Sequence, residues 1–393
     1  MSKGGEGMKE GWKMVKLGEV CEKTKNIKWQ DVATEEIYRY IDLTSVDRET
    51  SSILETQSVS SNNAPSRAKQ IVSKGDILFA TTRPTLKRVC IIPDRFEGDI
   101  CSTGFCVLRP KNAVLSNWIY YALKDDSFMT YITPLQKGAS YPAVTDNDVK
   151  NYVVPLPPFE EQHRIVGILD AAFAKIDALK KNAEENLKNA KALFQQVLAQ
   201  ELQPKEGWVE KKIGEVCEVI NGRAYKQNEL LNKGKYKVLR VGNFFTNNSW
   251  YYSDLELEEN KYCDKGDLLY AWSASFGPKI WDGERVIYHY HIWKMICNDC
   301  IDKFYMHYYL QSSLFIHKAL KDLHGTTMAH ITKGIMESTS ISFPSIEEQH
   351  RIVSTLDTLS EKCRRLEQVA QQTIRECDAL KQSILRQAFS GEL

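Results

Sequence analysis

The sequence contains the same seven residues twice, and this internal duplication limits the folds that the chain can adopt. The run EEQHRIV occupies Glu160–Val166 and returns at Glu347–Val353. The segments WKMVKLGEVCE at Trp12–Glu22 and WVEKKIGEVCE at Trp208–Glu218 also match. Such agreement is very unlikely by chance, so the 393-residue chain is interpreted as two related halves.

A long helix is predicted after the start of each EEQHRIV run. Prolines precede both segments, and paired glutamates lie in the first turn, where the helix dipole favours negative charge. No proline interrupts residues 160–203 or 346–393, and apolar or small residues recur every seven positions, as in a coiled coil. A helix of about 43 residues spans roughly 65 Å and must bury its apolar stripe against a partner.

The two helices are expected to pair with each other as an antiparallel coiled coil; separate helical bundles are the alternative. A short linker after Leu202 leads into the second globular segment, which favours the pairing. Asn186 falls on a predicted seam and could fix the register. The predicted coiled-coil core is Leu169, Ile176, Leu179, Leu193, Val197, Leu356, Leu359, Leu366, Leu380 and Ile384.

The landmarks of the two halves predict an α+β fold with pseudo-two-fold internal duplication. Lys74–Ala80 (KGDILFA) matches Lys265–Ala271 (KGDLLYA), a turn followed by an apolar strand. Strands are also expected at Tyr38–Thr44 and Leu239–Phe245, and helical hairpins at Asn117–Gln136 and Asp302–Leu323. The predicted organisation is a disordered start (1–10), a domain (11–155), a long helix (156–206), a second domain (207–343) and a second long helix (344–393).

Composition predicts a soluble, cytoplasmic protein. No stretch of about 18 apolar residues is present to cross a membrane, and the start of the chain does not resemble a signal peptide. Ten scattered cysteines fit reduced thiols better than a disulfide framework. Cys297 and Cys300 form a lone CxxC without a second pair, so no metal site is predicted. The net charge of +1 is silent on function.

No catalytic site is predicted. The sequence has no phosphate-binding GxxxxGK[ST] and no HExxH. His163 and His350 lie in the first helical turns, where capping and packing roles are favoured over acid–base chemistry. Leu156–Phe159 (LPPF) is similar to the motif of amino-methyltransferases, but Leu replaces the polar residue that accepts a hydrogen bond from the amine. This departure argues against a stand-alone methyltransferase.

Polar and basic loops at matching places in the two halves predict DNA contacts instead. One loop, Thr81–Arg88 (TTRPTLKR), offers hydroxyl and guanidinium groups that suit phosphates and base edges. Loops that diverge on a duplicated scaffold indicate ligand reading, although each one alone could be an ordinary solvated loop. The candidate DNA-binding residues are Thr81, Thr82, Arg83, Lys87, Arg88, Lys137, Ser140, Tyr141, Arg223, Tyr225, Lys226, Ser273, Ser275, Lys279, Thr326, Thr327 and His330.

The chain resembles the specificity (S) subunits of type I restriction–modification systems. The resemblance rests on PLPPFEEQHRIV at Pro155–Val166, FPSIEEQHRIV at Phe343–Val353, the two GD[IL]L strands, the paired W-x3-K-[LI]-G-E-V starts and the terminal AFSGEL at Ala388–Leu393. It covers essentially the whole chain beyond residue 10.

The resemblance implies a non-catalytic protein. Residues 11–155 and 207–343 would be target-recognition domains, each reading one half of an asymmetric, bipartite site in double-stranded DNA. The coiled coil would set the spacer and dock two modification (methyltransferase) subunits, and restriction subunits would join them. The chain itself would hold no cofactor: S-adenosylmethionine belongs to the modification subunit, and ATP and Mg to the restriction subunit.

Contacts to the modification subunits are assigned to apolar residues outside the predicted seams. They are Ile165, Phe173, Leu187, Phe194, Ile352 and Phe389. The alternatives are a structural coiled-coil spacer and a DNA-binding protein without a role in restriction–modification.

Overall fold

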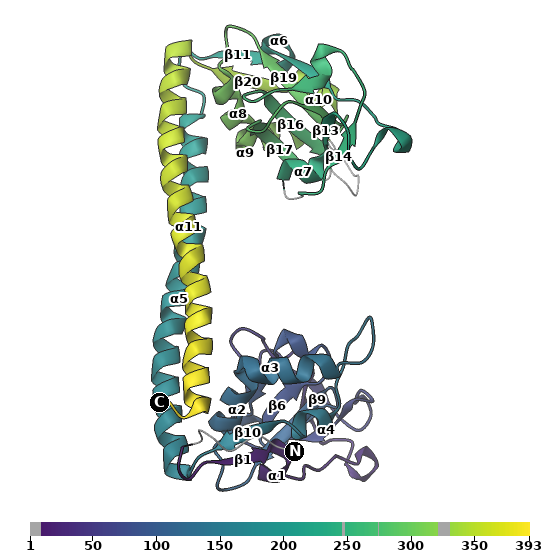
Figure 1. The fold of residues 1–393 in the computed structure, drawn as a ribbon, viewed down its shortest axis with the longest axis vertical. Coiled ribbons are helices and arrows are strands. Elements are labelled where there is room, and N and C mark those ends of the chain that lie inside the picture. The colour runs from purple at the N-terminus through teal and green to yellow at the C-terminus, as the bar shows by residue number, and fades with distance from the viewer. Residues whose placement is uncertain (1–8, 246–247, 274, 321–330) are drawn as a thin grey trace. The chain divides into compact units, whose positions relative to one another are not determined.

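A computed structural model describes residues 9–245, 248–273, 275–320 and 331–393. The chain divides into two compact units. Unit 1 comprises Met1–Asn182 and Gln372–Leu393, and unit 2 comprises Ala183–Gln371. Each unit therefore contains one globular domain together with part of both long helices, α5 (Phe159–Glu201) and α11 (Ile346–Ser390) (Figure 1).

The domain of unit 1 is built on two four-stranded sheets and a two-stranded ribbon. One sheet has the order β2-β9-β6-β7, the other β4-β3-β8-β5, and β1 pairs with β10. The strands are β1 (Lys13–Lys16), β2 (Cys21–Glu22), β3 (Tyr38–Ile41), β4 (Gln57–Val59), β5 (Ala68–Ile71), β6 (Ile77–Ala80), β7 (Val89–Ile91), β8 (Ile100–Ser102), β9 (Phe105–Pro110) and β10 (Val153–Leu156). The helices are α1 (Leu17–Val20), α2 (Ser116–Lys124), α3 (Asp126–Ile132) and α4 (Asp146–Lys150).

The domain of unit 2 repeats this topology. Its sheets have the orders β12-β19-β16-β17 and β14-β13-β18-β15, and β11 pairs with β20. The strands are β11 (Val209–Lys212), β12 (Cys217–Asn221), β13 (Tyr236–Leu239), β14 (Tyr251–Ser253), β15 (Tyr262–Cys263), β16 (Leu268–Ser273), β17 (Ser275–Ile280), β18 (Val286–Tyr288), β19 (Ile292–Cys297) and β20 (Ser340–Phe343). The helices are α6 (Ile213–Val216), α7 (Val241–Phe245), α8 (Lys303–Gln311), α9 (Ser313–Leu320) and α10 (Lys333–Ser338).

The predicted α+β fold with internal duplication is confirmed, with one local error. The two GD[IL]L segments form β6 and β16, and each preceding turn has a glycine at positive φ, Gly75 at 84° and Gly266 at 95°. The strand expected at Leu239–Phe245 is wrong, because β13 ends at Leu239 and the next residues form the short helix α7. Phe244 on this helix is buried, so burial of one aromatic ring overrides the β-rich composition.

Each domain is joined to its long helix by the same buried glutamine. Gln162 accepts a hydrogen bond from the Leu115 N–H at 3.0 Å and donates to the Ala113 and Pro157 carbonyls. Gln349 repeats the arrangement in unit 2: it accepts from the Asp302 N–H at 2.8 Å and donates to the carbonyls of Cys300 and Pro344. Both side chains are buried and fully used. The glutamine of EEQHRIV therefore attaches each domain to its long helix.

A second repeated contact links the helical hairpin to the long helix. The Tyr121 hydroxyl donates to Asp170 at 2.5 Å in unit 1, and the Tyr308 hydroxyl donates to Asp357 at 2.6 Å in unit 2. These hydrogen bonds to carboxylates are short, as expected for charged acceptors.

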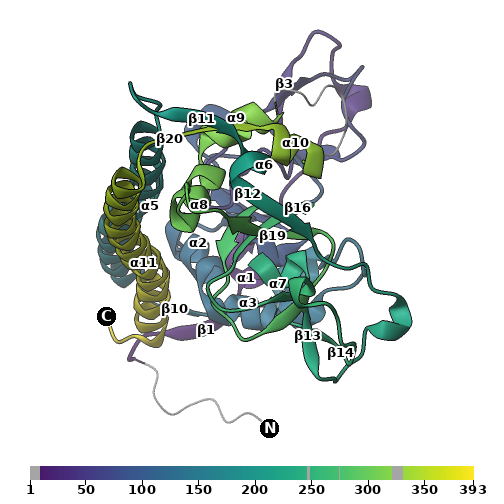
Figure 2. The ribbon, with the colours of Figure 1, turned by 90° about the horizontal axis from the view of Figure 1, so that it is seen from above.

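In both units α5 and α11 lie side by side as an antiparallel coiled coil (Figures 1 and 2). In unit 1, Lys180 forms an ion pair with Asp378 at 2.7 Å, and Asp177 forms one with Lys381. Residue numbers thus rise along α5 as they fall along α11. In unit 2, Arg351 of α11 forms an ion pair with Glu201 of α5 at 3.0 Å, beside the second domain.

The coiled-coil core is only partly the one predicted. One heptad row is buried, and half or more of its side chains are small Ala or Cys. The row consists of Leu169, Ile176, Ala183, Ala190, Leu356, Cys363, Ala370 and Cys377. Val197, Leu359 and Ile384 are partly buried. The assignment of Leu179, Leu193, Leu366 and Leu380 to the core is wrong, because these side chains are 53%, 44%, 55% and 50% exposed.

The error is one of register. The second row lies three residues before the first row rather than three residues after it, at positions that include Phe173, Leu187 and Phe194. Both choices satisfy a seven-residue repeat, and the larger aromatic side chains decide between them. Asn186 is exposed and does not fix the register.

No helix among the described residues is long and apolar enough to cross a membrane.

Candidate nucleic-acid interface

Two loops of unit 1 meet beyond the end of β6 and carry the exposed Arg83. Thr82 and Lys137 each form a β-bridge with Ala143, and the Arg83 N–H donates to the Pro142 carbonyl at 2.7 Å. Arg83 has φ of 51° and Lys87 has φ of 50°, a region that non-glycine residues seldom adopt. Two such residues in one loop mark a backbone held in place by its neighbours, as is common where a loop binds a ligand.

Arg83 stacks on a tyrosine from the neighbouring loop. Its guanidinium carbon lies 4.8 Å from the centre of the Tyr141 ring, and Tyr141 is 70% exposed. Lys137 and Ser140 are exposed on the same loop. Among the described residues, no carboxylate pairs with Arg83. The structure therefore brings Arg83, Lys137, Ser140 and Tyr141 together as an exposed cationic and aromatic surface that suits nucleic acid.

Three other candidates of this loop form hydrogen bonds or ion pairs with residues of the same domain. Thr81 is buried, and its hydroxyl donates to the Gly104 carbonyl at 2.9 Å, so its assignment as a DNA contact is wrong. The Arg88 guanidinium donates to the Val46 carbonyl, and Lys87 forms an ion pair with Asp126 at 2.9 Å. Strand β6, which Thr81 follows directly, is buried on both faces, which accounts for the burial of Thr81.

In unit 2 the cluster predicted at Arg223, Tyr225 and Lys226 mainly serves the fold. Arg223 forms a two-pronged ion pair with Glu229, at 2.9 and 2.8 Å, and its hydrogen bonds hold the pKa of Glu229 at about 2. Burial raises the pKa of Tyr225, whose hydroxyl finds no partner among the described residues. Of the three residues, only Lys226 is exposed. A guanidinium that is already doubly paired is a poor reader of DNA.

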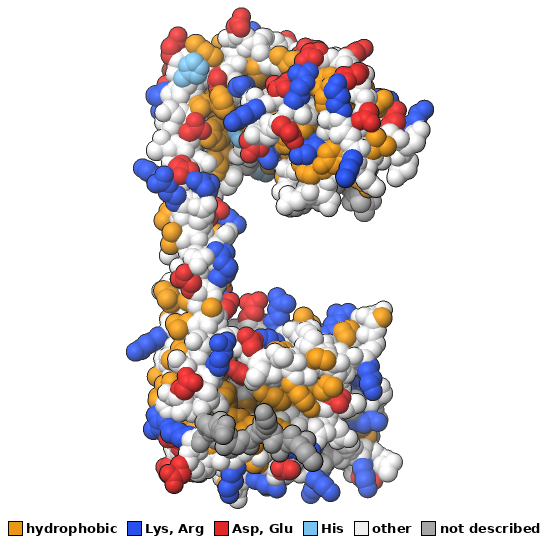
Figure 3. Space-filling view, viewed as in Figure 1, with side chains coloured by type: hydrophobic (Ala, Val, Ile, Leu, Met, Phe, Trp, Pro, Cys, Tyr) orange, Lys and Arg blue, Asp and Glu red, His pale blue; other side chains and the backbone are white. Residues whose placement is uncertain are grey.

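The hairpin of β16 and β17 carries three more candidates. Ser273 faces Ser275 across the ladder, and Ser275 is exposed. Lys279 lies 3.6 Å from Asp282 and above the Trp281 ring. Thr326, Thr327 and His330 fall outside the described residues. On the face of unit 2 shown in Figure 3, basic and acidic side chains are interspersed.

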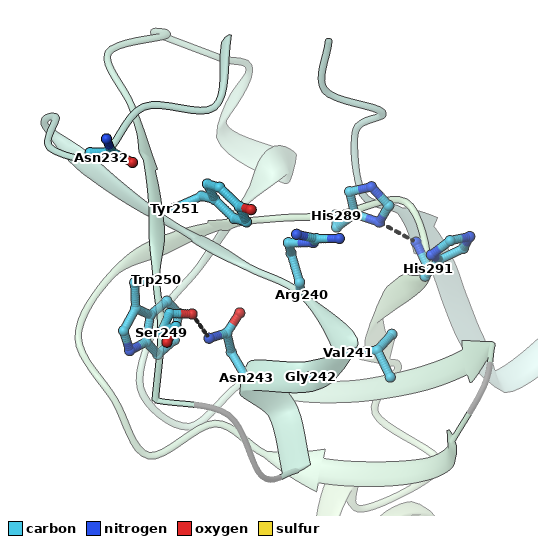
Figure 4. A pocket seen from close by; sticks show the side chains of 10 residues that line it. All are labelled: Asn232, Arg240, Val241, Gly242, Asn243, Ser249, Trp250, Tyr251, His289 and His291. Carbon is cyan, nitrogen blue, oxygen red and sulfur yellow. Dashed lines mark hydrogen bonds between the residues drawn. The ribbon is translucent and has the colours of Figure 1, made fainter. Parts of the chain in front are cut away.

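A pocket in unit 2 contains a second exposed arginine, which the sequence prediction missed. Arg240 follows β13, and its guanidinium carbon lies 5.2 Å from the Tyr251 ring (Figure 4). His289 and His291 also line this cavity of about 460 Å³. Burial, then the charges of His291 and Arg240, lowers the pKa of His289 to about 4, so its imidazole is neutral at pH 7. The run YHYH at Tyr288–His291 is the sequence feature that could have indicated this pocket.

No group of three or more His, Cys, Asp or Glu side chains that could hold a metal ion occurs in the described part of the chain. The ten cysteines are free thiols. Cys297 lies 3.9 Å from Cys217, sulfur to sulfur, across β12 and β19.

Comparison with known proteins identifies the scaffold on which these loops sit. The sequence model of the family "Type I restriction modification DNA specificity domain" matches residues 9–189 and 205–376. The chain belongs to this family. The two matched ranges follow the two duplicated halves, so the family fold occurs twice here.

Individual relatives of the specificity-domain family agree over most of the chain. The MjaVIII specificity subunit of Methanocaldococcus jannaschii is 24% identical over 413 residues, covering 98% of this chain and 93% of the relative. The EcoKI specificity subunit of Escherichia coli K12 is 27% identical over 328 residues, covering 75% and 69%. A chain solved in work on assembly and conformational transition of the type I R-M system superposes with a TM-score of 0.85 at 29% identity, covering 98% of this chain and 99% of that one.

The HsdS subunit of Thermoanaerobacter tengcongensis is also 29% identical, with both chains fully covered and a TM-score of 0.60.

The residues predicted to contact modification subunits are mostly covered by the chain itself. Ile165 and Ile352 are buried, and their assignment as docking residues is wrong. Both lie one residue before a seam position and pack against the domain. Phe389 packs on Trp118 with ring centres 4.8 Å apart. Phe173, Leu187 and Phe194 are partly buried in the second row of the coil.

Proposed function

We propose that this chain is the DNA-recognition subunit of a type I restriction–modification complex, in which each domain reads one half of an asymmetric split site. The observation that carries the proposal is the contrast within the duplicated scaffold. The junctions at Gln162 and Gln349 are the same, whereas the exposed arginine–tyrosine pairs, Arg83 with Tyr141 and Arg240 with Tyr251, sit on different elements. Different reading groups on equivalent domains imply different half-sites.

The coiled coil sets the spacer between the half-sites in this proposal. Its two helices have 43 and 45 residues without a proline. Inserting one heptad into both, after Asn182 in α5 and after Gln371 in α11, keeps the seam in register and adds roughly 10 Å, or about three base-pair steps. The recognised spacer should lengthen while both half-sites stay the same. An unchanged spacer would contradict the role of the coil.

Two modification subunits dock on the coil, one on each unit. The exposed leucines support a two-copy arrangement because they repeat: Leu179 and Leu380 in unit 1 correspond to Leu366 and Leu193 in unit 2. In unit 1, the ion pairs that flank Leu179 and Leu380 place them at the same level of the coil. Hydrophobic side chains are visible along the helices in Figure 3. Exposed apolar patches of this kind mark protein interaction sites.

The chain contributes recognition and no catalysis. S-adenosylmethionine belongs to the modification subunit, and ATP and Mg to the restriction subunit. The relatives named as specificity subunits support this division of labour.

Single-molecule methylation mapping tests the proposal. DNA is compared from cells that express this chain together with its modification subunit and from cells that express the modification subunit alone. Modified adenines in one split motif, present only with this chain, are the expected result. Identical methylation with and without the chain would overturn the proposal.

A further inference from the structure

The pocket of Arg240 lies at one edge of a sheet of unit 2. Arg240 directly follows β13 and His289 directly follows β18. These two strands are parallel, with Val238 opposite Ile287 and Leu239 opposite Tyr288. Because parallel strands end at the same edge, their next residues emerge together there, and such edges are common ligand sites. Figure 4 shows Arg240 between Tyr251 and His289.

Arg240 and His289 are two hydrogen-bond donors of this pocket, and the first is charged. Arg240 is exposed and stacked on Tyr251, and among the described residues no carboxylate pairs with it. His289 accepts a long hydrogen bond, 3.5 Å, at Nδ1 from the His291 N–H. A neutral imidazole that accepts at Nδ1 carries its proton on Nε2. Arg240 is the only Lys, Arg, Asp or Glu among the described residues that line the pocket.

The corresponding position in unit 1 carries a carboxylate in place of the arginine. Asp42 follows β3, the counterpart of β13, and its Oδ1 accepts hydrogen bonds from Thr44 and Ser45, with the Thr44 N–H at 2.7 Å and the Ser45 N–H at 2.9 Å. Its carboxylate is turned to its own backbone, and these hydrogen bonds lower its pKa. The arginine at this strand end is thus a feature of the second domain.

We propose that Arg240 reads a guanine in the major groove of the half-site bound by the second domain. Guanine presents two adjacent acceptors there, O6 and N7, and a guanidinium spans them with two parallel hydrogen bonds. A phosphate is the other anionic acceptor in DNA, but phosphate sites commonly gather several cations, whereas Arg240 is the only Lys or Arg among the described residues that line this pocket. Stacking on Tyr251 orients the planar guanidinium before DNA arrives.

The inference rests on the proposed function, and the assembled methyltransferase complex tests both. Complexes containing the original chain, Arg240→Ala or Arg240→Lys methylate a DNA library randomised over both half-sites. Arg240→Ala should lower the preference for one guanine of the second half-site by about 5- to 150-fold and leave the first half-site unchanged. Arg240→Lys should keep part of that preference.

The matched control is Arg285→Ala, because Arg285 is a surface arginine of the same domain that is paired with Glu259 and Asp264. It should leave base preference unchanged. A uniform loss of methylation over all sequences with Arg240→Ala would assign Arg240 to a phosphate, and no change would remove the pocket from the DNA interface; either outcome overturns the inference. The absence of any split motif with the original chain would instead refute the proposed function.

A synthetic duplex gives a second readout that does not depend on library selection. Replacing the guanine by 7-deazaguanine removes the N7 acceptor. The original complex should bind this duplex more weakly than the guanine duplex, whereas the Arg240→Ala complex should bind the two equally. Equal binding by the original complex would overturn the inference.

Discussion

The two domains share their attachment to the coil and differ at the surfaces that face solvent. At the attachment, Gln162 and Gln349 make the same three hydrogen bonds, and Tyr121 and Tyr308 reach the same aspartate position. At the strand ends, by contrast, Asp42 in one domain corresponds to Arg240 in the other. Buried hydrogen bonds tolerate little change, while an exposed side chain can be replaced at low cost in stability. The two halves therefore keep the same junction between domain and helix, whereas the exposed residues at the strand ends differ.

The largest effect is expected from breaking the shared frame. Gln162→Ala and Gln349→Ala each leave one buried N–H and two carbonyls without their partner, so each should destabilise its domain by about 3 kcal/mol or more. Urea unfolding of the purified chain measures the two losses. The exposed Gln200 provides the control, because Gln200→Ala should change stability by less than about 0.5 kcal/mol. A large loss at one glutamine and none at the other would break the equivalence of the junctions.

A smaller difference is expected from pH, because the second domain has a histidine where the first has Tyr120. Burial lowers the pKa of His307 to about 4, and its Nδ1 has no partner within the described residues. The unfolded chain, with a histidine pKa near 6.5, therefore binds more protons between pH 4 and 6.5. Stability is full above this window and falls as the pH drops, by roughly 2 kcal/mol at pH 5.

The substitution His307→Tyr should remove this loss of stability at low pH. The check is the difference in unfolding free energy between pH 7.5 and pH 5, which should shrink in the variant. His317 is exposed, and His317→Gln should leave the pH dependence as it is. If the variant retains the full dependence on pH, the two domains do not differ in this respect.

The reading surface of the first domain gives the next prediction. Arg83→Ala should weaken binding of the assembled complex by about 1 kcal/mol or more and alter only the half-site read by the first domain, because Arg83 has no acidic partner in the described residues. Arg48→Ala is the control, since Arg48 is exposed and adjacent to Glu49 at 3.5 Å. Methylation profiles that change in the second half-site would break the assignment of one domain to one half-site.

Sequence reasoning found the features that depend on near neighbours. The repeated EEQHRIV predicted both helix starts, and the KGD turns predicted β6 and β16, because each depends on a few consecutive residues. Arg83 and Tyr141 were predicted on polar loops with a glycine or proline nearby, and both side chains are exposed; their contact with DNA stays a prediction. Their stacking was not predictable, because it requires the bridges to Ala143.

Arg240 was missed because its site depends on the pairing of two distant strands. β13 and β18 are parallel neighbours, and no local sequence pattern predicts that residues 240 and 289 lie together at one edge of the sheet. Thr81 failed for the opposite reason: the loop composition is polar, but its first side chain still faces the core. The heptad row was right and its companion row wrong, since spacing alone does not say on which side of the first row the second one lies.

The smallest effect on stability is expected at the exposed leucines of the coiled coil. Substitutions there separate a role in docking the modification subunits from a role in the core of the coil. Leu179→Ser and Leu193→Ser change exposed side chains, one in each unit, and should alter the unfolding free energy by less than about 0.5 kcal/mol. Leu169→Ala, in the buried row, should cost about 2–5 kcal/mol. Titration with the modification subunit should show weaker association for Leu179→Ser and for Leu193→Ser, because a serine removes apolar area from the proposed contact. Unchanged association in both variants would place the modification subunits elsewhere, and a large loss of stability would restore these leucines to the core.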